Sequence, residues 1–209
     1  INRTSFKEVK GYENILNSNV INVIENLHDK FDKRIINLRK DRLEVLNYVL
    51  SNNESNPVKI LKKNHENHEW ILDVPEQLLI PGIEISGPSS QTSMFINGLN
   101  PNMEGFRADG DLDDNEDASG HSLEDTVQSA INRKGAVEGN LEYFDETKNK
   151  KYVLEEGKLP FFMHRERGIL LDEYDYLIDS KPVCASILDT VLTLMHCGIK
   201  QQEKGDYIF

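Results

Sequence analysis

Short strand-like segments alternate with loops and helix-like segments after Pro81, and this order constrains the fold most. Gly87-Pro88 ends the first strand, and the apolar run LPFFMH is the third. Strands that alternate with helices at this spacing predict parallel βα units. The predicted strands and helices are, in order, 83–85, 90–99, 106–109, 123–131, 159–164, 183–202 and 206–209.

Four such strands are too few to close a sheet on itself. A (β/α)₈ barrel alone takes about 250 residues, and an open sheet that ended on an apolar strand would expose an adhesive edge. We therefore expect this chain to be the N-terminal part of a longer protein, or of one whose remainder was removed. Residues 141–154 alternate around the turn DETKNKK and predict a β-hairpin, while 169–178 has no regular pattern.

Before Pro81 the pattern is helical. Apolar residues recur every three or four positions from Val20 to Val49, after a helix start at Ser18-Asn19, and the pattern stops at the polar linker 51–57. Residues 1–80 are thus predicted to form a helical segment with its linker, and residues 81–209 to form the strand–helix part.

Composition excludes several classes of function. A net charge of −12 argues against nucleic acid, whose phosphates need Lys and Arg partners. No apolar run reaches the roughly 20 residues that span a bilayer, and the N-terminus has no signal-peptide stretch. The two cysteines, Cys184 and Cys197, lie in apolar surroundings, which indicates buried free thiols in a reducing compartment.

An acidic cluster follows the second predicted strand, in the stretch FRADGDLDDNEDASG (106–120). A calcium EF-hand loop that starts at Asp109 would need Gly at position 6 and Glu at position 12, where Asp114 and Gly120 stand. A solvated loop explains the charge. The placement favours a site, because ligands bind at the carboxyl ends of strands in barrels and open α/β sheets.

The stretch HRERG follows the next predicted strand and places two arginines beside that cluster. Arg165 and Arg167 either form structural ion pairs with the carboxylates or supply a fixed cation for an oxyanion or enolate. His164 is more typical of a strand end than of catalysis, and His65 and His68 lack a nearby third metal ligand. Ser122 is a plausible cap for the helix that follows the acidic cluster, with Asp125 near its positive end.

Several segments in order resemble malate synthase of the shorter, A-type isoform. They are DKFDKRIINLRKDR, EWILDVPEQLLIPGIEISGPSSQTSMFINGLN, LEDTVQSAINRKGAV, HRERG and EKGDYIF. The resemblance as a whole covers residues 20–209 almost continuously. The resemblance implies a (β/α)₈ TIM barrel, of which this chain supplies the N-terminal helical clasp and about the first four strands, while a C-terminal helical domain completes the family's fold.

The resemblance also implies an activity. The family condenses acetyl-CoA with glyoxylate and hydrolyses the thioester to malate and CoA. In that chemistry Mg²⁺ polarises glyoxylate, an aspartate removes a proton from the acetyl methyl group, and an arginine stabilises the enolate oxygen. Matching HRERG to the family's Arg-Pro-Arg-Gly implies that Arg165 is the catalytic arginine, with Arg167 in a secondary place.

The family's Ala-Asp-Phe-Glu-Asp motif near the metal is altered here. Ala108-Asp109 matches its start, and counting back from LEDTVQSAINR places its Glu-Asp on Glu116 and Asp117. Five extra residues near 110–114 would reconcile the two, whereas a gapless match from Asp109 would lose one carboxylate. Asp109, Glu116 and Asp117 are therefore near-metal candidates. The direct metal ligands and the catalytic aspartate are expected beyond Phe209, so residues 1–209 alone are expected to be inactive.

Two alternatives stay open beside a malate synthase of the glyoxylate cycle. One is a related barrel lyase or synthase for another acyl-CoA and 2-oxo acid, and the other is a catalytically inactive relative. The expected partners are acetyl-CoA, glyoxylate and the remainder of the barrel, with no nucleic acid or membrane. The expected location is the cytoplasm, or the glyoxysome or peroxisome in a eukaryote.

Overall fold

The computed structural model describes residues 3–52, 76, 79 and 82–204. Two units divide the chain, one made of Ile1–Lys30 with Gly82–Phe209 and the other of Phe31–Pro81. Three predictions fall outside the described residues: most of the polar linker, the pair His65 and His68, and the strand at 206–209.

The long N-terminal helix is confirmed. Helix α1 covers Ser18–Asn52, and the Asn17 side chain accepts hydrogen bonds from the backbone N–H groups of Asn19 and Val20 at 3.1 and 3.2 Å. This cap satisfies donors that have no partner within the helix. Strand β1 (Thr4–Phe6) and a 3₁₀ turn (Tyr12–Asn14) precede α1 and were not predicted.

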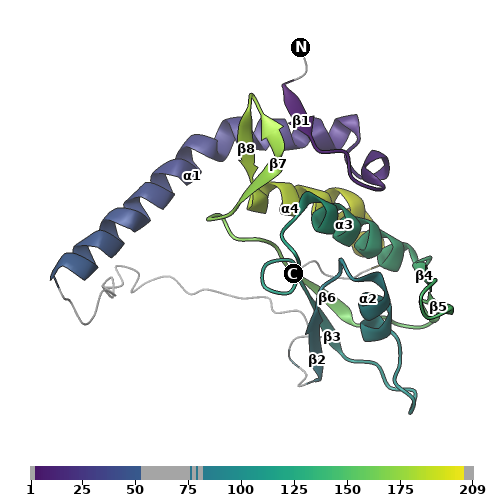
Figure 1. Ribbon diagram of the computed structural model, residues 1–209. Helices are drawn as coiled ribbons and strands as arrows, with labels where there is room; N and C mark the ends of the chain where they lie inside the picture. The colour runs from purple at the N-terminus through teal and green to yellow at the C-terminus, as the bar shows by residue number, and fades with distance from the viewer. Residues whose placement is uncertain (1–2, 53–75, 77–78, 80–81, 205–209) are drawn as a thin grey trace. The chain divides into compact units, whose positions relative to one another are not determined.

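Three parallel strands form the sheet that positions the candidate site (Figure 1). They are β2 (Glu84–Gly87), β3 (Gly110–Asp114) and β6 (Phe161–Arg165), in that order across the sheet. The predicted first and third strands are confirmed. The predicted strand at 106–109 is wrong, because residues 110–114 form the strand and the acidic residues expected in a loop belong to it.

The register of β3 and β6 decides which side chains share a face. Asp111 pairs with Phe162, Asp113 with His164, and Asp114 with Arg165. Successive side chains of a strand point to opposite faces. Asp111 and Asp113 therefore share the face that α2 and α3 cover, while Asp114 and Arg165 belong to the other face.

Helices α2 (Thr92–Leu99) and α3 (Leu123–Glu138) follow β2 and β3, as expected for βα units. The Ser122 cap is confirmed, since its side chain accepts from the Asp125 N–H at 3.1 Å. Gly139 ends α3 with a φ of 77°, a left-handed conformation that favours glycine. The predicted last helix is observed as α4 (Ala185–Thr193), a π-helical turn (Leu194–Gly198) and α5 (Ile199–Glu203).

A second, antiparallel sheet has the order β1–β7–β8. Strands β7 (Asp172–Ile178) and β8 (Lys181–Cys184) form a hairpin whose turn residues, Asp179 and Ser180, both have positive φ. The prediction of an irregular segment at 169–178 is wrong because β7 gains its partners from β1 and β8, one of them distant in sequence. Strands β4 (Glu142–Asp145) and β5 (Lys150–Val153) confirm the hairpin prediction.

Two buried apolar clusters lie in the unit that contains the sheets. One joins the first turns of α1 to α3, α4 and β7, and the other lies under α2, the β4–β5 hairpin and β6. Cys184 and Cys197 are both buried thiols outside any disulfide, as predicted, and burial raises the pKa of Cys197 to about 12. None of the described helices is long and apolar enough to cross a bilayer.

The described residues thus form a mixed α/β structure with small sheets and no closed barrel. Its three-stranded parallel sheet agrees with the predicted βα units. The complete barrel and the two-part division at residue 80 stay predictions.

Candidate functional site

The carboxyl ends of β3 and β6 bring Arg165 together with three carboxylates. Arg165 Nη1 lies 2.6 Å from Asp117 Oδ2 and 3.4 Å from Asp114 Oδ2, and Nη2 lies 3.0 Å from Glu116 Oε2. We call these four residues the Arg165 cluster. It combines Arg165 with two of the predicted near-metal acids, Glu116 and Asp117, and adds Asp114, which was not singled out.

Backbone hydrogen bonds hold the turn after β3 in place. Asp114 Oδ1 accepts from the N–H groups of Glu116 and Asp117 at 2.9 and 3.0 Å. Glu116 Oε1 accepts from the Gly168 N–H at 3.1 Å. A Cβ on Gly168 would lie 2.8 Å from that oxygen, so glycine permits this approach. Glu116 therefore connects the turn after β3 to the HRERG segment, through Gly168 and Arg165.

Arg165 remains open to solvent despite its partners, with its side chain 42% exposed. Desolvation disfavours the charged guanidinium, but Asp117, Asp114 and Glu116 outweigh it and raise the pKa of Arg165. The group is thus a fixed, permanently charged donor at a strand end, where a substrate oxyanion could approach.

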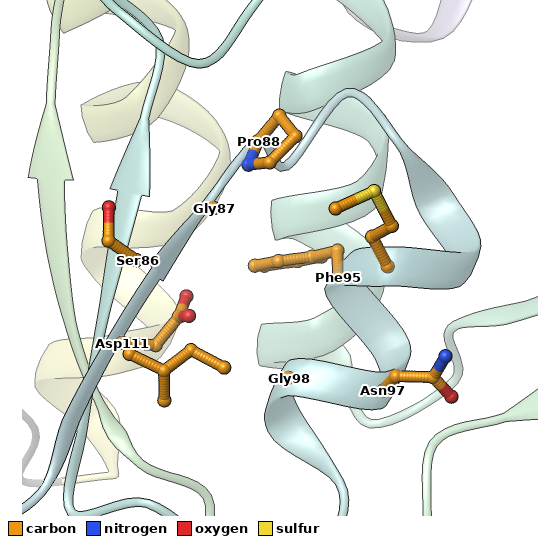
Figure 2. A pocket seen from close by; sticks show the side chains of 9 residues that line it. Ser86, Gly87, Pro88, Phe95, Asn97, Gly98 and Asp111 are labelled. Atoms are coloured by element: carbon orange, nitrogen blue, oxygen red, sulfur yellow. The ribbon is translucent and has the colours of Figure 1, made fainter.

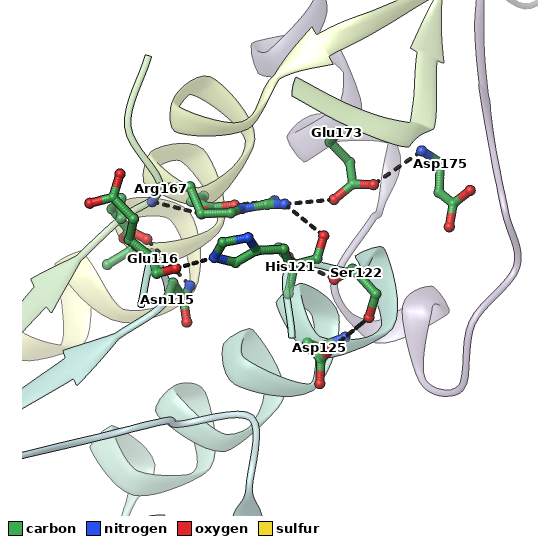
Figure 3. A network of polar contacts seen from close by, with 12 residues as sticks. Asn115, Glu116, His121, Ser122, Asp125, Arg167, Glu173 and Asp175 are labelled. Carbon is green, nitrogen blue, oxygen red and sulfur yellow. Dashed lines mark hydrogen bonds and ion pairs between the residues drawn. The ribbon is translucent and has the colours of Figure 1, made fainter. Parts of the chain in front are cut away.

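Arg167 lies two residues further along the chain, and only 2% of its side chain is exposed. Figure 3 shows it among its polar partners. Its Nε and Nη2 donate to the two oxygens of Asp189 at 2.9 and 2.7 Å, and Nη1 donates to Glu173 Oε2 at 2.9 Å. These contacts tie the end of β6 to α4 and β7. The geometry therefore gives Arg167 a structural role, the alternative that the sequence left open.

Asp109 does not join the Arg165 cluster. It precedes β3, at the amino end of the strand, and its Oδ2 accepts from the Ile83 N–H at 2.8 Å. A Cβ on Gly82 would lie within 2.7–2.8 Å of the Asp109 side chain, so this contact is close. The structure therefore separates Asp109 from Glu116 and Asp117 by the length of β3.

A buried polar network on the helix side of the sheet was missed. Asp113 Oδ2 lies 3.0 Å from Arg133 Nε and 3.1 Å from His164 Nδ1, and Arg133 Nη1 donates to Glu166 Oε1 at 3.2 Å. Thr193 on α4 bonds to both Arg133 and Glu166. The network links both strands to α3 and α4, directly behind the Arg165 cluster.

Charge compensation explains how Asp113 tolerates burial. Burial alone would raise its pKa, but Arg133 and His164 outweigh that and lower the pKa of Asp113. The sequence held no local signal for this network, because Arg133 and His164 reach Asp113 from a helix and a strand that are distant in sequence.

The near-metal candidates Asp109, Glu116 and Asp117 all contact protein groups. Within the described part of the chain, no group of three or more His, Cys, Asp or Glu side chains is arranged to hold a metal ion. Asp114, Glu116 and Asp117 each place an oxygen on Arg165 instead. The described residues therefore do not fit a complete magnesium site.

Comparison with known proteins finds several relatives that are named malate synthase. The chain is 34% identical over 129 residues to glyoxysomal malate synthase of Brassica napus, 29% over 190 residues to that of Ricinus communis, and 33% over 138 residues to malate synthase of Myxococcus xanthus. The chain is similar to malate synthases. No family model matches it.

The similarity is partial on both sides. The three matches cover 61%, 88% and 66% of this chain, but only 22%, 32% and 24% of the respective malate synthases. The chain thus spans about a fifth to a third of the length of these curated relatives. The comparisons support a malate synthase-like relationship, while the isoform and the acidic motif stay predictions.

Proposed function

We propose that this chain supplies the first strands and the enolate-stabilising arginine of a malate synthase. That enzyme condenses acetyl-CoA with glyoxylate and hydrolyses the thioester to malate and CoA. The observation that carries the proposal is the exposed Arg165 at the carboxyl end of a parallel strand, in a chain similar to malate synthases. Ligands of barrel enzymes bind at that end of the strands.

The parallel sheet supports completion as a (β/α)₈ barrel. Strands β2, β3 and β6 follow one another across the sheet in the order of the chain and are connected through α2 and α3, with the β4–β5 hairpin between α3 and β6. Apart from this hairpin, that is the arrangement of consecutive barrel strands. β2 and β6 are the outer strands of this sheet. Leu112 and Met163, on the face opposite α2 and α3, are only half-buried. Further strands from the remainder of the protein would cover both features.

Arg165 has the chemistry that the condensation needs. When a base removes a proton from the acetyl methyl group, negative charge develops on the thioester oxygen. A guanidinium already held by Asp114, Glu116 and Asp117 stabilises that charge without reorganising, and it stays protonated throughout. The base belongs to the remainder of the barrel. Magnesium enters the proposal through the resemblance alone, because the described residues do not form its site.

The position of β3 changes how the acidic motif is matched. A strand at residues 110–114 supports a match without an insertion between the strand and the motif. We place the family's Ala-Asp-Phe-Glu-Asp on residues 113–117, with Asp113 in place of Ala and Asn115 in place of Phe as the departures. Asp109 then drops out of the near-metal set. Asp114, which carries Arg165 and the turn together, takes its place.

Names of the relatives bear on location. Those from Brassica napus and Ricinus communis are described as glyoxysomal. We propose the glyoxysome or peroxisome for this protein, in place of the cytoplasm, if its source is a eukaryote. A fluorescent fusion of the native polypeptide that stayed outside peroxisomes would contradict this.

The test is glyoxylate-dependent release of CoA thiol from acetyl-CoA by the native polypeptide. Arg165→Gln is expected to lower kcat by about 10²-fold or more, as loss of an oxyanion donor does. Arg165→Lys should also be impaired, because an ammonium lacks the planar fork of donors. Full activity in either variant would overturn the role assigned to Arg165.

A matched control exists at the other end of the chain. Arg3 is similarly exposed, at 40%, and pairs with two carboxylates, Asp29 and Asp179. Arg3→Gln removes an ion-paired surface arginine of the same kind and should leave kcat unchanged. An equal loss of activity in Arg3→Gln would show that the effect of Arg165→Gln is not local.

The ion pairs of Arg165 also favour a second candidate, a catalytically inactive relative. A guanidinium tied to three carboxylates can serve the fold alone. Thiol release by the wild-type protein removes this candidate. Turnover of other 2-oxo acids at a rate above that of glyoxylate would instead favour the related barrel lyase or synthase.

A further inference from the structure

A hollow lies between α2 and the strands β2 and β3, on the helix side of the sheet. It has a volume of about 310 Å³, near the small end of the roughly 300–1,000 Å³ typical of ligand pockets. Figure 2 shows the Asp111 carboxylate and the Phe95 ring pointing into it, while the Asn97 side chain points away. Its principal apolar lining residues are Ile85, Pro88, Met94 and Phe95.

Asp111 is the unusual member of this lining. Only 4% of the residue is exposed, and within the described residues its Oδ2 has no hydrogen-bond partner. A buried carboxylate oxygen without a hydrogen-bond partner is costly, and one in a native protein calls for an explanation. Burial, with a smaller contribution from Asp113, raises the pKa of Asp111 to about 7.

The neighbouring Asp113 shows what Asp111 lacks. Asp113 is equally buried but has Arg133 and His164 within 3.0–3.1 Å. The strand neighbours of Asp111 are apolar: Ile85 on β2 and Phe162 on β6. Helix α2, with the sequence TSMFINGL, has no charged residue. Among the described residues that line the hollow, Asp111 is thus the charged one, and its carboxylate lies at the base of a largely apolar space.

We propose that this hollow binds a small organic cation with an apolar body, such as an arylmethyl ammonium or an amidinium. The cation would donate to Asp111, and its ring would lie against Phe95 and Met94. Aromatic and thioether side chains suit such a body. The site is distinct from the Arg165 cluster, which lies on the opposite face of the sheet, so this inference does not depend on the proposed enzymatic function.

Calorimetric titration of the native protein at pH 8 tests the proposal, with benzylamine and benzamidine as cationic probes. Benzyl alcohol serves as the neutral control of similar shape. Saturable binding of a cationic probe is expected, about tenfold or more tighter than that of the alcohol, because hydrogen bonds to charged groups are the stronger ones. Absence of saturable binding by both cations, or equal binding of the alcohol, would overturn the proposal.

Two variants locate the site. Asp111→Asn keeps the shape, removes the charge, and should weaken binding about tenfold or more, while the exposed Asp41→Asn is the matched control and should change nothing. Gly98→Ala would place a methyl group 3.1 Å from Ile85 Cδ1 and 3.8 Å from Asp111 Oδ1, which narrows the hollow. Gly98→Ala should also weaken binding, and unchanged affinity in either hollow variant would contradict the assignment.

Discussion

Arg165 and Arg167 are two residues apart in HRERG, yet the structure uses them in opposite ways. Arg165 is 42% exposed at the strand end with three carboxylates around it, whereas Arg167 is 2% exposed and sealed against Asp189 and Glu173. Ion pairing alone therefore does not distinguish Arg165, which we propose as functional, from a buried arginine that ties the fold together. Exposure separates them, because an open cation can meet a substrate and a buried cation stabilises the fold.

The largest expected effect is on stability, from the buried arginine. Arg167→Met leaves Asp189 and Glu173 buried without their cation, and it should lower the free energy of unfolding by about 3–5 kcal/mol. Urea denaturation of the native protein measures this. A loss below about 1 kcal/mol would remove the contrast between the two arginines.

Asp111 extends the comparison to a buried carboxylate whose Oδ2 has no hydrogen-bond partner among the described residues. Its folded-state pKa of about 7 lies above the usual 3.8, so the stability associated with protonated Asp111 is present at low pH and is lost as pH rises toward and through 7. Asp111→Asn should therefore stabilise the protein at pH 8 by on the order of 3 kcal/mol, with little effect near pH 4.

Unfolding curves of Asp111→Asn and the wild-type protein at both pH values test this. Asp41→Asn, an exposed carboxylate, is the control and should show no such dependence. If Asp111→Asn destabilised the protein equally at pH 4 and pH 8, Asp111 would have a partner in the native protein.

Gly168 connects the two arginines, because its N–H holds Glu116 beside Arg165. In Gly168→Ala the new methyl would press on Glu116 Oε1, the mobile end of a side chain, so Glu116 should swing away. We expect a loss of about 1 kcal/mol, the net value of one hydrogen bond. A double-mutant cycle of Gly168→Ala with Glu116→Gln checks it, since independent effects would show that Gly168 does not act through Glu116.

The smallest stability effect is expected for Arg165→Gln. Exposed ion pairs contribute roughly 0–1 kcal/mol, so its free energy of unfolding should stay within about 1 kcal/mol of the wild-type value. Arg3→Gln should behave alike. A large destabilisation by Arg165→Gln would make Arg165 a structural residue like Arg167.

The sequence by itself determined the elements whose signals are local. The spacing of apolar residues gave α1, the turn DETKNKK gave the β4–β5 hairpin, and Ser122 gave the start of α3. These signals suffice because helix periodicity, turn chemistry and capping depend on residues a few positions apart. The burial of both cysteine thiols, without a disulfide, followed from their apolar sequence surroundings in the same way.

Only the tertiary structure decided where the acidic residues belong. From sequence, GDLDD is expected to be a loop, because a buried strand of these five residues would place three carboxylates in the protein interior. Yet Arg133, which lies 20 residues later on α3, and His164, on the neighbouring strand β6, compensate the buried negative charge of Asp113. Contacts between residues distant in sequence also pair β7 with β1 and bury Arg167 against Asp189, while Arg165 stays exposed to solvent. Charge becomes compatible with burial only through partners that the chain brings together when it folds.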